Sequence, residues 1–145
     1  MKTMWWSSLV VAVVATMSLP CFAVDGPKTR ILMLTQSKGF QHGSVRRPAE
    51  KEKLALAEIA IIQLGKDSEL FEVTCTQDAA ADFTKANLAN YDIVAFYTTG
   101  ALPIAKEDFD YFRNEWLTQP GKGFIGFHSA TDTYGNFEPY WDLVG

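Results

Sequence analysis

The sequence predicts an α/β domain with a doubly wound parallel sheet, a flavodoxin-like three-layer sandwich. Four short apolar segments have continuous rather than alternating hydrophobicity, which is typical of strands buried on both faces. Segments with helical spacing of apolar residues lie between them, and the connections are short. Since parallel crossovers are right-handed, the order β-α-β-α-β-α-β places helices on both faces of the sheet.

The four predicted strands are rich in β-branched and aromatic residues and are bounded by polar or glycine-containing loops. They cover residues 29–35, 70–76, 92–97 and 123–127.

The first predicted helix begins near Pro48 and ends before Gly65, because proline suits a first helical turn and glycine suits the position after the last one. Its apolar residues share one helical face: Leu54, Ala57, Ile61 and Leu64.

A second, short helix is predicted over residues 84–90, with Thr84 as its N-cap and a hydrophobic staple between Phe83 and Leu88. The third predicted helix stops at Pro120-Gly121. It buries an apolar stripe of Ala105, Phe109, Phe112 and Trp116. Residues 128–145 are expected to be loop-like.

Residues 1–23 have the pattern of a signal peptide. Lys2 precedes an apolar run over residues 5–19, and small residues stand at the −3 and −1 positions of a cleavage site after Ala23. The run is short for a membrane span. We therefore expect a periplasmic or secreted domain over residues 24–145, without integral membrane association after cleavage; a retained N-terminal anchor is the alternative.

The charge of the chain argues against a nucleic-acid-binding protein, and its cysteine content argues against a disulfide-stabilised domain. The formal net charge is −4 and basic residues are scattered apart from Arg46-Arg47, so a nucleic-acid partner is not expected. Cleavage would leave Cys75 as the single cysteine, which excludes an intrachain disulfide. We interpret Cys75 as a buried small apolar side chain rather than a nucleophile.

The chain ends at residues 140–145 without a finished element, and four strands are few for this architecture. We expect either an incomplete, C-terminally truncated domain with an uncovered sheet edge, or a chain that needs a partner to complete its sheet. Such an edge favours self-association.

Both histidines fall where this architecture binds ligands, beyond the carboxyl ends of the strands near the point at which strand order reverses. His42 lies in the glycine-containing loop after the first strand, and His128 directly follows the fourth. We predict that the two imidazoles meet at a shared cleft as catalytic groups, with Asp132 as an orienting group or ligand. The alternative is that each histidine only fixes its loop.

Loop residues around the histidines are the predicted substrate contacts: Gly39, Phe40, Thr98, Thr99, Gly100 and Ser129. His42, His128 and Asp132 have ligand atoms that suit zinc, but their spacing does not demand a metal, so we assign no metal site. No cofactor is identified, because dinucleotide and P-loop motifs are absent from the sequence. A serine nucleophile elbow also fails, since histidine stands at residue 128.

The tail is aromatic, and its rings suit either the apolar faces of sugars or packing onto the rest of the domain. These residues are Tyr134, Phe137, Tyr140 and Trp141. For Trp141 we favour packing.

Four segments of the chain resemble ThuA-like, trehalose-utilisation domains over residues 30–145: ILMLTQSKGFQH, TTG, GKGFIGFHSATDT and YWDLVG. The resemblance implies a class I glutamine amidotransferase-like fold. It places His128 at the turn where an amidotransferase has its nucleophilic cysteine, so amide transfer by that route is not expected.

The resemblance further implies an exported protein acting in trehalose or related disaccharide utilisation, on oxidised (keto) sugars. It also implies a longer domain, with further histidine and acidic positions in a second half. Two other hypotheses remain open: a non-catalytic carbohydrate-binding or interaction module, and a flavodoxin-type electron carrier. The bulky loop over residues 38–42 is unlike the hydroxyl-rich phosphate cradle that the carrier needs.

Overall fold

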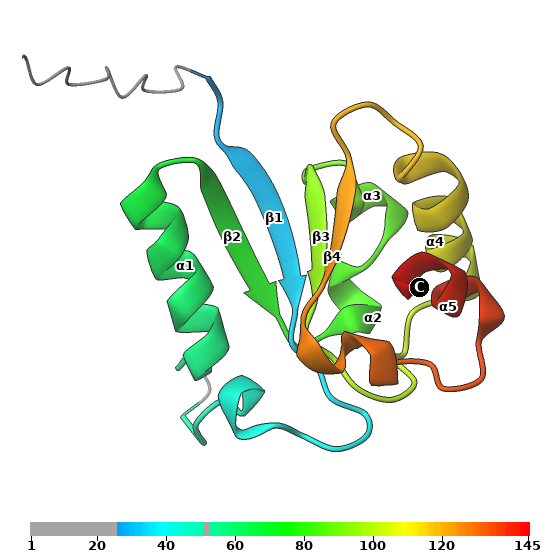
Figure 1. The fold of residues 1–145 in the computed structure, drawn as a ribbon, viewed down its shortest axis with the longest axis horizontal. Helices are drawn as coiled ribbons and strands as arrows, with labels where there is room; N and C mark the ends of the chain where they lie inside the picture. Colours follow the sequence, from blue (N-terminus) through cyan, green and yellow to red (C-terminus); the bar gives the residue numbers. More distant parts are fainter. Residues whose placement is uncertain (1–25, 51–52) are drawn as a thin grey trace, which may run out of the picture.

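The computed structural model describes residues 26–50 and 53–145, so the predicted signal peptide lies outside the described residues. Four parallel strands form one sheet in the order β2-β1-β3-β4 (Figure 1). They are β1 (Thr29–Leu34), β2 (Phe71–Thr76), β3 (Ile93–Phe96) and β4 (Gly123–Gly126). The predicted doubly wound sheet is confirmed, and strand order reverses between β1 and β3.

Helices lie on both faces of this sheet, which gives the three layers of the sandwich (Figure 1). One face carries α1 (Leu56–Ser68). The other carries α2 (Ala79–Asp82), α3 (Lys85–Leu88), α4 (Lys106–Tyr111) and α5 (Glu138–Val144). Short 3₁₀ turns η1 (Gly43–Val45) and η3 (His128–Asp132) follow β1 and β4, and the π-helical turn η2 (Phe112–Trp116) extends α4.

The predicted bounds of the first helix were wrong at both ends. Helix α1 begins at Leu56, well after Pro48, and continues through Gly65 to Ser68. A Cβ atom at Gly65 would lie 2.7 Å from the carbonyl oxygen of Phe71, so this glycine permits close packing of α1 on β2. The helix instead ends just before Glu69, its C-cap residue, which adopts the left-handed conformation (φ 58°) that terminates many helices.

The larger core cluster lies between the sheet and the face that carries α2 to α5. The predicted stripe of Phe109, Phe112 and Trp116 is buried there, whereas Ala105 is the exposed N-cap of α4. The Thr84 cap is also confirmed, since its side chain accepts a hydrogen bond from the Asn87 N–H.

The loop-like prediction for the tail was wrong, because η3 and α5 form there. Tyr140 is fully buried and donates a 2.7 Å hydrogen bond to the Ala130 carbonyl, and burial raises its pKa to about 12. The Tyr134 hydroxyl donates to the Leu102 carbonyl. Both rings therefore pack onto the core of this domain and are not free for a sugar, while Trp141 stays 45% exposed.

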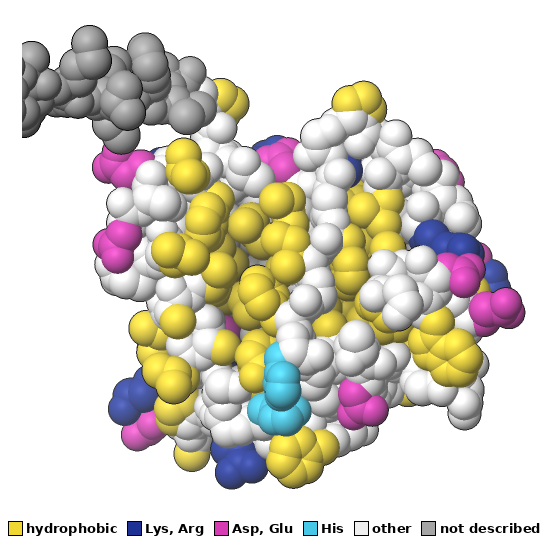
Figure 2. Space-filling view, viewed as in Figure 1, with side chains coloured by type: hydrophobic (Ala, Val, Ile, Leu, Met, Phe, Trp, Pro, Cys, Tyr) yellow, Lys and Arg dark blue, Asp and Glu magenta, His cyan; other side chains and the backbone are white. Residues whose placement is uncertain are grey.

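Strand β4 is an edge strand of the described sheet, as predicted. Its backbone forms a pale strip in Figure 2, with apolar side chains on either side. No charged residue or proline stands in β4 to discourage pairing, and Ile125 is 38% exposed. Self-association through this edge stays a prediction. None of the described helices is long and apolar enough to span a membrane.

Candidate functional site

The loops after β1 and β4 bring both histidines to the carboxyl edge of the sheet (Figures 1 and 2). His42 is the partly buried residue that precedes η1, and His128 is the exposed first residue of η3. Their ring centroids are 4.6 Å apart with an interplanar angle of 68°. The two imidazoles thus meet at one rim, in the arrangement expected from their positions at the strand ends.

His128 has an unusual backbone conformation, with φ at +45°. This region is costly for residues other than glycine, and such residues cluster at functional sites. Hydrogen bonds on both sides hold the turn: Phe127 N–H donates to the Phe96 carbonyl, and Ala130 N–H donates to the Phe127 carbonyl. The turn from β4 into η3 therefore presents the His128 side chain at the edge of the sheet in a fixed position.

Tyr97 completes the group, and sequence reasoning missed it. It directly follows β3, and its ring centroid lies 6.1 Å from that of His42 and 5.7 Å from that of His128. Its hydroxyl forms a 2.8 Å hydrogen bond with the Ser44 hydroxyl. The signal was present, because Tyr97 stands at the carboxyl end of the strand beside the switch point, but the strand pattern of residues 92–97 predicts only a strand residue there.

Phe40 lies where a substrate contact was predicted. Its ring packs edge-on against His42 at 4.9 Å, and its side chain is 69% exposed. It is therefore free to contact a ligand that approaches the imidazoles.

Thr98 and Thr99 are 0% and 1% exposed, so the structure does not place them where a substrate could reach them. The Thr98 hydroxyl bonds with the Thr133 hydroxyl, and the Thr99 hydroxyl donates to the Phe40 carbonyl. This corrects the substrate-contact prediction: both side chains join the loops after β1, β3 and β4. Both residues lie at the carboxyl edge of the sheet, as expected, but their hydroxyl groups point into the protein rather than toward solvent.

The predicted contacts Gly39 and Gly100 pack against each other where two of these loops cross. A Cβ atom at Gly100, which has φ +70°, would lie 2.6 Å from the Gly39 nitrogen. The Gly100 N–H also donates a 2.9 Å hydrogen bond to the Asp132 carbonyl. These glycines permit the close backbone approach that brings the His42 loop beside η3.

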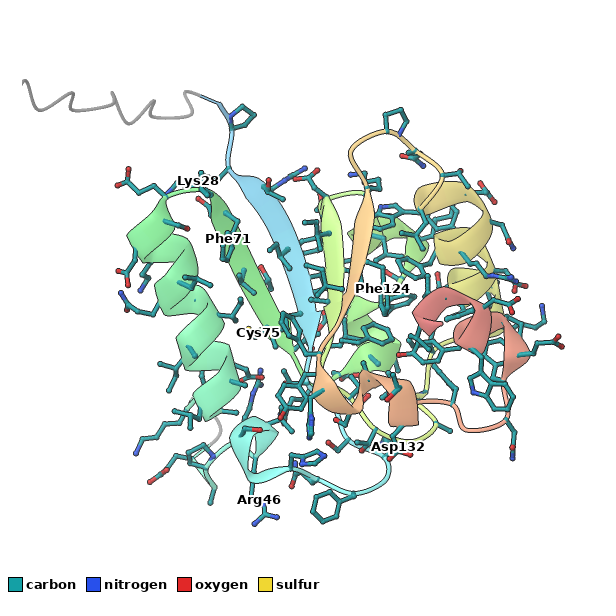
Figure 3. The ribbon with its side chains drawn as sticks, in the orientation of Figure 1. Lys28, Arg46, Phe71, Cys75, Phe124 and Asp132 are labelled. Atoms are coloured by element: carbon teal, nitrogen blue, oxygen red, sulfur yellow. The ribbon has the colours of Figure 1, made fainter. Side chains whose placement is uncertain are left out.

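Asp132 and Ser129 lie on η3 with His128 (Asp132 is labelled in Figure 3). Asp132 is exposed, and no cluster of three or more histidine, cysteine, aspartate or glutamate residues with metal-binding geometry occurs in the described part of the chain. Asp132 therefore does not join the two imidazoles as a third ligand. Ser129 is 9% exposed, and its hydroxyl has no hydrogen-bond partner among the described residues.

A buried ion pair below the His42 loop was also missed. Glu58 on α1 is fully buried, and Arg47 donates to both of its carboxylate oxygens, with a shortest separation of 2.9 Å. Arg47 also donates to the Cys75 carbonyl, and the Thr35 hydroxyl donates to Glu58. The signal was the helical spacing of Glu58 from Leu54 and Ile61, which puts a carboxylate on the inner face of the helix.

Gln77 extends this network to the loop itself. Its side-chain amide donates a 2.7 Å hydrogen bond to the Val45 carbonyl in η1 and another to the Thr35 carbonyl. The loop that carries His42 is therefore tied to the ends of β1 and β2 as well as to α1.

Cys75 is partly buried rather than fully buried as predicted, and it packs beside the core cluster on the α1 face of the sheet. Burial raises its pKa to about 12, and the Glu58 carboxylate adds to the rise. At pH 8 this lowers the thiolate fraction roughly a thousandfold relative to an ordinary cysteine.

We expect iodoacetamide at pH 8 to label native Cys21→Ser protein at a rate roughly three orders of magnitude below that of the urea-unfolded protein. Because the folded pKa is raised, the stabilisation linked to this thiol is full below about pH 9 and falls as pH rises toward 12. Native labelling at the unfolded rate would contradict this assignment.

A pocket of about 200 Å³ lies beside His128, between β4 and the end of α5. Phe124 and Gly126 line its β4 side, and Leu143 and Val144 line its α5 side (Phe124 is labelled in Figure 3). The imidazole of His128 therefore borders both the His42 ring and a recess whose exposed lining is mixed polar and apolar.

A parallel sheet with its functional groups at the carboxyl edge, and with a strained residue at the turn after β4, defines a class I glutamine amidotransferase-like α/β domain. The family model ThuA, described as trehalose utilisation, matches residues 30–145. The chain therefore belongs to the ThuA trehalose-utilisation family. No curated protein and no solved structure matches it.

Proposed function

We propose that this chain is an exported carbohydrate enzyme that acts on oxidised (keto) forms of trehalose or a related disaccharide. Membership of the trehalose-utilisation family supports the substrate class. The observation that carries the proposal is the pair of imidazoles 4.6 Å apart at the sheet edge. Export to the periplasm or exterior rests on the signal-peptide pattern of residues 1–23.

His128 is the principal group in this proposal, as an acid–base or a ligand, and His42 is its partner. An imidazole changes charge near neutral pH, so it can move a proton to or from a keto sugar, whose carbonyl acidifies the neighbouring C–H bond. The exposed position of His128 gives a substrate access to it, and the Tyr97 hydroxyl supplies a nearby hydrogen-bonding group. Phe40 offers an aromatic face to the apolar side of a sugar ring.

We expect His128→Ala in the full-length protein to lower kcat for a keto-disaccharide by about 100-fold to 10,000-fold, the usual worth of a positioned acid–base group. Turnover is followed by chromatography of the sugar products. Gln119→Ala, at the opposite end of the sheet, is the matched surface control and should keep full activity. Unchanged turnover in a folded His128→Ala protein would remove His128 from the mechanism.

A non-catalytic carbohydrate-binding module is the second candidate, favoured by the exposed rings of Phe40 and Trp141. It requires saturable disaccharide binding without turnover, retained when both histidines are replaced by alanine. Calorimetry on the His42→Ala/His128→Ala protein separates the two proposals, because the enzyme proposal expects turnover in the unmodified protein and its loss in this variant.

A further inference from the structure

We propose that the pocket beside His128 is a subsite for one neutral pyranose ring, next to the place where the reacting ring of a disaccharide lies. The inference rests on the proposed function, because it takes the reacting ring to lie at the two imidazoles. It goes beyond that function by giving the second ring a binding position of its own and by naming residues that select it.

The size of the pocket suits one sugar ring. Its volume is about 200 Å³. Sites that enclose drug-sized ligands have volumes of roughly 300–1,000 Å³. A disaccharide is a ligand of that size, so this pocket encloses only one of its two rings and leaves the other outside.

Apolar side chains line the pocket from two elements. Phe124 lies on the β4 side, and Leu143 and Val144 lie on the α5 side. All three are partly buried and pack against the larger core cluster, which holds them in place. A pyranose ring has apolar C–H faces, and aromatic and aliphatic side chains bury such faces favourably.

The backbone of β4 supplies hydrogen-bonding groups to the same pocket. The N–H groups of Gly123 and Phe127 donate to backbone carbonyls on the β3 side. Because alternate residues of a strand point their backbone groups to opposite sides, Phe124 and Gly126 point theirs away from β3. These are the two β4 residues that line the pocket, and no other described strand pairs with β4. Sugar hydroxyls both donate and accept, so they satisfy N–H and C=O groups alike.

The histidines indicate which ring the pocket receives. His128 lines it together with Thr131, and both are exposed residues of η3. His42 is not among the lining residues. A reacting ring that meets both imidazoles therefore lies outside the pocket, and the pocket is left for the ring that does not react. The Thr131 hydroxyl is the side-chain group that would bind it.

The lining also indicates the charge of the ring. None of the described residues that line the pocket is a lysine, arginine, aspartate or glutamate. A sugar phosphate or sugar acid held there would bury its charge without a counter-ion, which is costly. The pocket therefore fits a neutral hexose.

The test is titration of D-glucose into ¹⁵N-labelled full-chain protein, followed by amide NMR. We expect saturable shifts of the Gly126 and Thr131 amide signals, with a Kd on the order of 1 mM for so small a ligand. D-glucuronate, which has the same ring with a carboxylate, should bind at least about 10-fold more weakly.

Two substitutions test the lining. Val144→Phe fills the pocket and should weaken glucose binding at least about 10-fold. Ile59→Phe, at an exposed position on α1, is its matched control and should bind glucose as the parent does. Thr131→Ala removes one hydroxyl at an exposed position and should weaken binding about 3-fold to 10-fold, the usual worth of one hydrogen bond. Thr118→Ala, at another exposed threonine, should have no effect.

The subsite proposal is overturned if glucose causes no saturable shifts at Gly126 and Thr131, if glucuronate binds as well as glucose, or if Thr131→Ala and a folded Val144→Phe protein both bind glucose unchanged. Its failure is distinguishable from that of the proposed function. Turnover that requires His128, with no glucose binding in the pocket, would leave the enzyme proposal without this subsite. Glucose binding in the pocket of a protein that turns over no keto-disaccharide would leave the subsite without the enzyme.

Discussion

Replacing Gly100 with alanine is expected to destabilise the fold by about 3 kcal/mol or more, and to separate the two halves of the candidate site. Left-handed backbone costs a residue with a side chain about 1–2 kcal/mol. The added Cβ atom would also lie 2.6 Å from both the Gly39 nitrogen and the Lys38 carbonyl carbon, and overpacking of this kind costs about 1–3 kcal/mol. The measurement is urea unfolding followed by fluorescence.

Gly121→Ala is the matched control, because Gly121 has a similar φ of +79° but nothing within 4 Å of its added Cβ atom. It should cost only the backbone strain, about 1–2 kcal/mol. The difference between the two variants isolates the contact between the loops after β1 and β3. Equal losses would show that this contact is not under steric constraint.

The second large effect concerns the buried carboxylate of Glu58. Arg47→Ala removes its cation and leaves a fully buried carboxylate without a charge partner, which typically costs about 3–5 kcal/mol. The Arg47 side chain is 26% exposed, so solvent screening places the expected loss at the low end of that range, about 3 kcal/mol. The readout is the unfolding free energy at pH 7.

Two further variants separate charge burial from simple loss of a side chain. Arg30→Ala breaks the exposed pair with Asp92, whose side chains are 52% and 32% exposed, and should cost about 1 kcal/mol or less. The double change Arg47→Met/Glu58→Leu should recover much of the lost stability, because apolar replacement of a buried ion pair is often neutral. If Arg47→Ala costs no more than Arg30→Ala, the ion pair does not hold this region together.

The strands were predictable because their information is local and repetitive. Each is a short run of β-formers between polar loops, and observed ends differ from predicted ones by at most one residue. The end of the first helix was less predictable. Glycine commonly terminates helices, but Gly65 lies inside this helix, where its lack of a side chain allows close contact with Phe71. Only the neighbouring strand distinguishes these two uses of glycine.

Some features of the candidate site were also predictable from the sequence, and others were not. The convergence of His42 and His128 followed from chain order and the rule that ligands gather at carboxyl strand ends. The inward direction of Thr98 and Thr99, and the addition of Tyr97, depended on which face each residue presents after its strand ends. A strand alternates its faces regularly, but a loop does not, so these orientations were not readable from spacing.

The amino-acid sequence alone determined the parallel α/β architecture and the edge of the sheet where the histidines lie, because hydrophobic periodicity and chain order are properties of neighbouring residues. The tertiary structure decided that Glu58 is paired inside the domain, that Tyr134 and Tyr140 belong to its core, and that the two imidazole rings pack edge-on with centroids 4.6 Å apart. Each of these depends on contacts between segments distant in the chain, and their geometry is set only when the layers pack.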